Sequence, residues 1–385
     1  MKRRLVVETV VMVGLAGISV RDAVAQSSVT LYGMLNAGVS YTSNVQGHSA
    51  FRAQSGNVGS RFGFRGSEDL GGGLKAVFKL EEGFSVLNGN IQSGAGRMFS
   101  REAWVGLSSS QYGTLTIGRQ YDSVMQYLGP FSMSDTIAVG PEANHAYDND
   151  ELDGSFRVNN AVNFESISYG GFKVTGLYGF SNSTNFGDNR AYSFAMSYNN
   201  GPLSLAAGYR QLNSDNINGA IANANGAVTE DNILIAGTQR TYGAAAGYTF
   251  GPATVHLLFT QTRLQNAVGV SSGFSGLTNG IPFTSPSVRF DNYEVNTFWY
   301  VTPAVLLVGG YTLTDAHING GQPKFHQFTL EASYSLSKRT DVFVQGEFQH
   351  VAGADGLGLP PFILNAGVSS SSNIGFAMVG IHVRF

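Results

Sequence analysis

The sequence predicts an all-β fold, a 16-stranded antiparallel transmembrane β-barrel. Three observations predict it: apolar and polar residues alternate through most of the chain, short turns alternate with long loops, and the composition is unusual. Of the 385 residues, 50 are Gly, 12% are aromatic and only 13% are charged. Average proteins have about 7% Gly and about 25% charged residues. The aromatic content excludes most disordered chains, and the lack of Cys excludes disulfides and thiolate chemistry.

The N-terminal segment has the pattern of an export signal. Three basic residues at positions 2–4 precede an apolar stretch at 5–20, and Ala23-Val24-Ala25 matches a cleavage site. Residues 1–25 are therefore predicted to be a signal peptide and residues 26–385 a single barrel domain. Glu8 within the apolar stretch is unusual, and a disordered N-terminal tail is the alternative.

Alternation with a period of two identifies the strands. In residues 74–81, apolar side chains at even positions alternate with mainly charged ones, and residues 172–180, 192–198 and 203–210 repeat the pattern. A period of two gives a strand one apolar face and one polar face. Beyond residue 25 no apolar run approaches the ~18 residues that a membrane helix needs. Strands are therefore the expected membrane-crossing elements.

The connections between these strands predict the topology. Short turn signals occur at 69–73, 108–113, 168–171, 199–202, 250–252, 302–303 and 337–341. Longer polar segments lie at 43–57, 84–98, 122–156, 182–190, 212–238, 264–288, 315–324 and 351–373. Short turns that alternate with long loops are typical of outer-membrane barrels, which close so that every backbone polar group is paired. A large soluble β-sandwich would also alternate, but it would not explain an export signal.

Several segments together resemble the Gram-negative general porins of the beta-proteobacterial type. They are SVTLYG at 28–33, SRFGFRGSEDLGGGLKA at 60–76, AWVGL at 103–107, GTLTIGRQ at 113–120, YSLSKRT at 334–340 and VGIHVRF at 379–385. The resemblance spans residues 26–385. It implies a homotrimer of 16-stranded barrels that passes ions and small hydrophilic solutes. It also implies contact with outer-membrane lipid and lipopolysaccharide, and insertion by the barrel assembly machinery.

The third long loop is the expected constriction. Residues 121–156 contain no Lys or Arg but seven acids: Asp122, Asp135, Glu142, Asp148, Asp150, Glu151 and Asp153. Loops of this length without strands are usually functional. The resemblance implies a constriction loop folded into the lumen, with Pro141-Glu142 similar to the Pro-Glu pair at the tip of that loop in the family. The alternative is a solvated acidic surface loop.

A basic wall is expected to face this loop. Because Phe62 and Phe64 take the outward phase, Arg61 and Arg65 point into the lumen. The other members are expected to be Lys75 and Lys79 by the same phase, Arg157 after the loop, and Arg101, which corresponds by motif to a constriction arginine of the family. Charges opposed across a narrow lumen set ion preference. These cations outnumber Asp135 and Glu142, which predicts a weak anion preference. Taken singly, each cation could instead be a water-facing residue that is simply hydrated.

Two further residues are assigned structural roles. Arg119 shares the outward phase of Leu115 and Ile117, and charge is costly against lipid. It is therefore expected to lie at a subunit interface or to latch a neighbour's second loop, or else to sit in water at the loop edge. Phe385, the last residue given, is expected to belong to an assembly signal, or simply to the outward face of the last strand.

Other classes of function have weaker support. No cofactor, no metal site and no enzyme activity are predicted, because the seven His residues lack metal-ligand spacing and no nucleophile has a base and an orienting partner. The acids at 148–154 lack EF-hand spacing, although an opportunistic divalent ion stays open. A net charge of −3 without an internal basic run argues against nucleic acid. An outer-membrane enzyme, a substrate-specific channel and an adhesin or assembly barrel are the alternatives.

Overall fold

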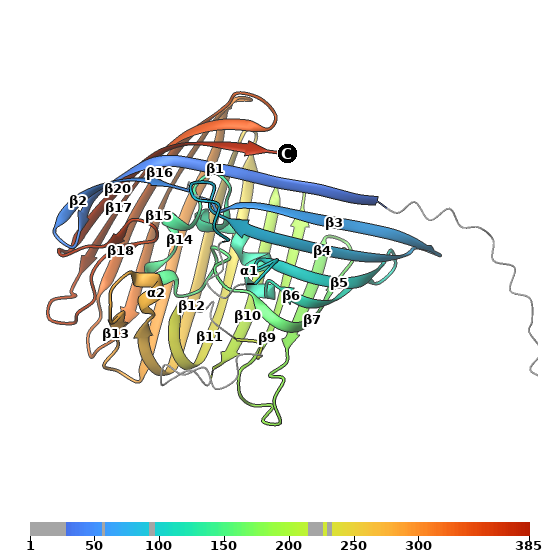
Figure 1. Ribbon diagram of the computed structural model, residues 1–385, viewed down its shortest axis with the longest axis horizontal. Helices are drawn as coiled ribbons and strands as arrows, with labels where there is room; N and C mark the ends of the chain where they lie inside the picture. The colour runs from blue at the N-terminus through green and yellow to red at the C-terminus, as the bar shows by residue number, and fades with distance from the viewer. Residues whose placement is uncertain (1–27, 56–57, 92–96, 215–225, 229–232) are drawn as a thin grey trace, which may run out of the picture.

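One sheet, antiparallel from strand to strand, closes on itself into a barrel (Figure 1). The computed structural model describes residues 28–55, 58–91, 97–214, 226–228 and 233–385; the predicted signal peptide at 1–25 lies outside them. Within these residues, the strands of the wall are β1 (Ser28–Val45), β3 (Ser60–Gly71), β4 (Leu74–Phe84), β5 (Glu102–Ser109), β6 (Gly113–Gln120), β7 (Val158–Ser166), β8 (Phe172–Gly179), β9 (Arg190–Asn200), β10 (Leu203–Asn213), β11 (Leu234–Phe250), β12 (Ala253–Val270), β14 (Ser287–Thr302), β15 (Val305–His317), β16 (Lys324–Ser335), β17 (Thr340–Ala352) and β20 (Asn373–Arg384). The predicted 16-stranded antiparallel barrel is confirmed.

Closure is achieved by β1, which pairs with β3 on one side and with β20 on the other. Leu31 is opposite Phe64, and Val39 is opposite Val379. Beyond β20, the Phe385 N–H donates to the Gly33 carbonyl and the Gly33 N–H donates to the Phe385 carbonyl, each at 3.1 Å. A Cβ on Gly33 would lie 2.4 Å from the Phe385 ring, so this seam requires glycine there.

Short turns connect the wall strands at one end of the barrel, and long loops connect them at the other end. All seven predicted turns join wall strands, and the β3–β4 turn is made by glycines 71–73, each with a positive φ that glycine adopts without strain. The long loops at the other end contain more regular structure than the polar sequence suggests. Outside the loop between β6 and β7, these loops contain β2 (His48–Gln54), β13 (Ile281–Pro282), β18 (Phe362–Ile363), β19 (Gly367–Val368) and the one-turn helix α2 (Ser272–Ser275).

The expectation that segments 43–57, 264–288 and 351–373 are plain loops is therefore corrected. β2 forms a hairpin with β1, β13 pairs with the end of β12, and β18 pairs with β19. The physical reason is an apolar cluster at the mouth that joins loop and strand residues, including Phe283, Phe290, Phe325 and Phe362. Apolar residues that loops bring together can be buried there as in a core.

The two faces of the wall differ as the alternation predicts. On β14, Tyr293 and Val295 are 50% and 43% exposed, whereas Glu294 between them is 3% exposed. The outward side chains are apolar because hydrocarbon offers no hydrogen-bond partners. In the part of the chain that the structure describes, no helix is long and apolar enough to cross a membrane.

The loop between β6 and β7 lies inside the barrel (Figure 1). It contains α1 (Ser123–Leu128) and four 3-10 turns, η1 (Gly129–Phe131), η2 (Met133–Asp135), η3 (Pro141–Ala143) and η4 (Ala146–Asp148). Asp122 caps α1 by accepting from the backbone N–H groups of Val124 and Met125. Val124 and Leu128 pack on wall residues that include Leu258. The predicted inserted loop is confirmed, and the solvated surface loop is excluded.

Candidate functional site: the constriction of the lumen

A buried arginine ties the constriction loop to the wall. Arg210 on β10 has no exposed surface, and its guanidinium bonds to Asp122 Oδ2 at 3.0 Å and to Glu151 Oε2 at 2.9 Å. It also donates to the Asp150 carbonyl at 3.1 Å. A buried ion pair is tolerated where opposite charges compensate each other and further hydrogen bonds add to the attraction. The Arg210 Nε itself has no hydrogen-bond partner among the residues that the structure describes. Two of the loop acids therefore serve the anchor and do not face the channel.

A histidine between two carboxylates makes a second anchor. His145 Nδ1 lies 2.7 Å from Asp150 Oδ2, and Nε2 lies 3.0 Å from Glu294 Oε2 on β14. Glu294 also accepts from the Met133 N–H at 2.8 Å. Burial alone would lower the pKa of His145, but Asp150 and Glu294 together raise it to about 10. The imidazole is therefore protonated at neutral pH and holds the loop to β14.

Glu142 lies elsewhere than the sequence suggests. Its side chain is completely buried, and Oε1 accepts from Asn365 Nδ2 at 2.9 Å in the loop before β20. Burial, reinforced by Glu347, raises the pKa of Glu142 well above its usual range. The structure therefore does not place Glu142 opposite the basic wall, because the loop turns this carboxyl toward β17 and the segment before β20.

Asp135 is a loop acid that does face the basic side. Burial raises the pKa of Asp135 most and Asp153 raises it further, whereas Arg61 and Arg101 lower it. The resulting pKa is about 7. Asp135 thus carries a partial negative charge at neutral pH, in the field of two wall arginines.

On the basic side, one tyrosine joins two arginines. Arg101 and Arg157 each donate to the Tyr121 hydroxyl, at 2.9 and 3.0 Å, and the Arg157 guanidinium lies 5.0 Å from the centre of the Tyr121 ring. Arg101 also pairs with Glu81 at 2.6 Å. Tyr121 is not among the residues that the sequence predicted for this site, and its only signal is its position, directly after β6 where the loop begins.

The remaining wall cations are held differently. Tyr32 donates to Glu81 at 2.8 Å, and Arg65 lies over the Tyr32 ring at 5.3 Å, which places Arg65 on the lumen face. Lys79 pairs with Glu102 and lies 3.5 Å from Glu81. Glu81 and Glu102 were not predicted as wall residues, although their inward phase could have revealed them.

Lys75 lies apart from this group. It is exposed beside the β3–β4 turn, opposite Asp69 and Ser108. The structure therefore brings together five of the six predicted cations on the lumen face and leaves Lys75 near the end of the barrel.

Arg119 is held by its own chain. It is 8% exposed, its Nε donates to the Ser100 carbonyl at 2.6 Å, and its Nη1 donates to Asn159 Oδ1 at 2.6 Å. It lines an outward recess of about 740 Å³ together with Arg97 and Asn182. Its contact with a second subunit, like the assembly role of Phe385, stays a prediction.

Together these features define a class of protein. A closed barrel whose polar lumen is narrowed by an internal loop, with charges of opposite sign across the gap, is a membrane diffusion channel. Among the described residues, no group of three or more His, Cys, Asp or Glu side chains is arranged to hold a metal ion.

Comparisons with known proteins identify the family. The Gram-negative porin family model matches residues 9–353, so the chain belongs to that family. It is 32% identical to an outer membrane porin protein of Bordetella pertussis, over 90% of this chain and 94% of that one. It is 30% identical to outer membrane porin protein 32 of Delftia acidovorans, with 94% and 95% covered.

A solved structure agrees with the sequence relatives. The anion-selective porin from Comamonas acidovorans superimposes with a TM-score of 0.70 at 25% identity, and covers 94% of this chain and 100% of its own. The protein is an outer-membrane porin of a Gram-negative bacterium, a water-filled channel for passive diffusion of ions and small hydrophilic solutes. Porins are channels and not a class of enzymes.

Proposed function

We propose that this channel prefers anions over cations. The observation that carries the proposal is an asymmetry of exposure between the two sides of the constriction. Arg65 is exposed, and Arg61 and Arg157 are half-buried on the lumen side. Five of the seven loop acids are hidden in comparison, each at most 1% exposed: Asp122, Glu142, Asp148, Asp150 and Glu151. Asp135 and Asp153 are half-buried.

Buried acids contribute little to the field in the water. Arg210 neutralises Asp122 and His145 neutralises Asp150. Burial raises the pKa of Glu151 to about 8 and raises the pKa of Glu142 and Asp148 well above the usual range. Cations that face water raise the local concentration of counter-ions. The anion-selective relative from Comamonas acidovorans supports the same direction.

The test is the reversal potential of single channels in a KCl gradient. The double variant Arg61→Ala with Arg157→Ala is expected to shift it toward cations and to enlarge the conductance. Glu142→Gln is the matched control, because it removes a buried acid and is expected to leave selectivity unchanged. A wild-type channel that selects cations, or a double variant that behaves as wild type, would contradict the proposal.

We further propose that the protein works as a homotrimer, with the outward recess around Arg97 and Arg119 receiving a loop of the neighbouring subunit. The recess contains several polar side chains although apolar outward residues such as Ile117 also line it, which supports contact with protein there. Arg119→Ala is expected to lower the temperature at which the trimer dissociates in electrophoresis. An unchanged dissociation temperature would remove Arg119 from the interface.

The predicted export and assembly steps complete the proposal. Cleavage after Ala25 would leave Gln26 as the first residue, which N-terminal sequencing tests. Delivery by the barrel assembly machinery is expected to depend on Phe385, so its deletion should lower surface levels more than synthesis. In the outer membrane, the outward wall is expected to contact lipid and lipopolysaccharide.

A further inference from the structure

Four neighbouring strands bring basic side chains into one row on the outside of the barrel. Arg240 on β11 is opposite Arg263 on β12, Arg263 is opposite Arg289 on β14, and Arg289 is opposite His317 on β15. Neighbouring strands are about 4.8 Å apart, so the row is about 14 Å long. None of these side chains belongs to the lumen or to the constriction.

The outward direction of the row follows from the strand period. Arg240 is two residues from Tyr242 and Arg289 is four residues from Tyr293, and both tyrosines belong to the exposed outer face, at 37% and 50% exposure. Arg263 is likewise four residues from Phe259, whose ring contacts that of Tyr293 at 5.2 Å. The row therefore lies on the loop side of an aromatic band, where an outer-membrane barrel passes from hydrocarbon to lipid headgroups.

Each arginine is already held in place through Nε. Arg240 Nε donates to Gln211 at 3.0 Å, Arg263 Nε donates to Gln261 at 2.5 Å, and Arg289 Nε lies 2.9 Å from Asp291. A guanidinium held at Nε presents its Nη groups to another acceptor, and that planar edge matches a phosphate. In Arg289, Nη2 already contacts His317 Nε2, which leaves Nη1 for a ligand. Holding the side chains in advance lowers the entropy that a ligand must overcome.

The charges around the row favour an anion. Asp291 and Asp315 lie one outward position nearer the turns, and Lys324 is opposite Asp315. The three arginines and Lys324 therefore outnumber the two carboxylates, even without His317. Asp291 also accepts from Gln261, and Asp315 accepts from Gln322 at 3.0 Å.

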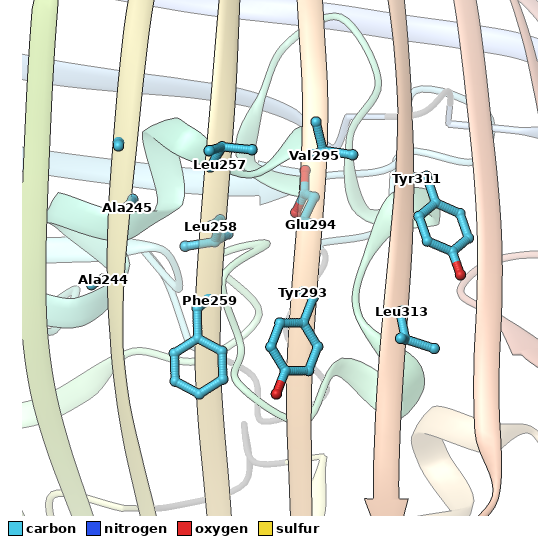
Figure 2. A pocket seen from close by; sticks show the side chains of 11 residues that line it. Ala244, Ala245, Leu257, Leu258, Phe259, Tyr293, Glu294, Val295, Tyr311 and Leu313 are labelled. Atoms are coloured by element: carbon cyan, nitrogen blue, oxygen red, sulfur yellow. The ribbon is translucent and has the colours of Figure 1, made fainter.

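An apolar groove lies on the turn side of the row, one outward position beyond Asp291 and Asp315 (Figure 2). It has a volume of about 520 Å³, and its lining includes Ala244, Ala246, Leu257, Phe259, Tyr293 and Tyr311. Because alanine side chains are small, β11 leaves a shallow depression beside the bulky side chains of β12 and β14. In Figure 2 Phe259 and Tyr293 project from the wall, whereas Glu294 points behind it.

We propose that the row and the groove form one binding site for a phosphorylated, acylated lipid of the outer leaflet. The lipid phosphate bonds to Arg240, Arg263 and Arg289, and an acyl chain lies in the groove. Phe259 is four residues from Arg263, or about 14 Å along the strand, a distance that a lipid headgroup and the start of its chain can span. This site specifies the lipopolysaccharide contact proposed above and rests on it.

The groove distinguishes a lipid from a free phosphate. An inorganic phosphate would use the arginines alone and would leave the groove without a role. The test therefore uses refolded full-length protein in detergent, with bisphosphorylated lipid A and its dephosphorylated form as probes, and native mass spectrometry or calorimetry as the measurement. Inorganic pyrophosphate serves as the headgroup without chains.

The triple variant Arg240→Gln, Arg263→Gln and Arg289→Gln is expected to weaken binding of bisphosphorylated lipid A at least tenfold and to change binding of the dephosphorylated form little. Ala244→Leu with Ala246→Leu, which fills the groove, is expected to weaken binding of both lipids. Arg339→Gln, in the turn before β17 at the other end of the barrel, is the matched control and should bind as wild type. Pyrophosphate at equal concentration should not compete.

Three outcomes would overturn the proposal. They are a triple variant that binds lipid A as wild type, pyrophosphate that competes as well as the lipid, and binding that EDTA abolishes but the triple variant retains. The last would mean that a divalent cation on Asp291 and Asp315 bridges the lipid. Conductance and anion preference of the triple variant should equal those of the wild type, so failure of this site is distinguishable from failure of the channel proposal.

Discussion

Asp135 makes the selectivity of the channel depend on pH near neutrality. Its pKa is about 7, raised mainly by burial. A group with that pKa is about nine-tenths charged at pH 8 and about one-tenth charged at pH 6. Lowering the pH therefore removes one negative charge opposite Arg61 and Arg101, and anion preference rises as the pH falls.

The size of this effect follows from the Coulomb energy of one charge near a passing ion. At about 7 Å in water, one unit charge changes an ion's energy by about 0.6 kcal/mol, and salt at about 0.1 M halves this. Anions and cations shift in opposite directions, so the ratio of anion to cation permeability changes by about two- to threefold.

The measurement is the reversal potential of wild type and Asp135→Asn at pH 6, 7 and 8. Wild type should become more anion-selective toward pH 6, whereas Asp135→Asn should show at every pH the selectivity that wild type has at pH 6. The same pH dependence in both proteins would refute the reasoning, because another group would then be titrating in the channel.

Three other predictions follow from the contacts of the loop. Tyr121→Phe removes the hydroxyl that accepts from both Arg101 and Arg157, a loss of about 1–3 kcal/mol for the buried donors. The open-channel current noise should therefore increase, and noise equal to that of wild type would contradict this prediction. Arg210→Ala leaves Asp122 and Glu151 unpaired and should destabilise the loop by about 3–5 kcal/mol, measured by protease cleavage of refolded protein. The triple variant Arg210→Met, Asp122→Asn and Glu151→Gln should destabilise the loop less than Arg210→Met alone. Equal destabilisation by the two variants would argue against ion pairing. Because the pKa of His145 is raised to about 10, the stabilisation that it gives the loop is complete below about pH 6.5 and is lost as the pH rises through 10. Channel closures should therefore increase near pH 10 in wild type but not in His145→Gln.

Much of the fold was predictable because it depends on short-range patterns. The period of two assigned Arg61 and Arg65 to the lumen face, and Gly71–Gly73 fixed a turn, since both signals are carried by adjacent residues. The number of strands followed from the alternation of short and long connections. These features needed no knowledge of which distant segments meet.

The positions of the acids were less predictable because they depend on long-range contacts. Glu142 is buried because Asn365, more than 200 positions later, bonds to it. Likewise, the mouth contains strands where polar loops were expected because its apolar cluster joins residues from several loops. Tyr121 bridges two arginines that directly precede different strands, β5 and β7, and no pattern along the chain shows that.

The pairing of β1 with β20 has a consequence for the order of folding. Leu35 and Val383 are partners across this seam although they lie near opposite ends of the sequence. Until β20 arrives, every shorter segment of the sheet has two unpaired edges, and such edges recruit strands from other chains. Contacts so distant in sequence form slowly. Association between unfinished chains therefore competes with folding until β20 is available to pair with β1.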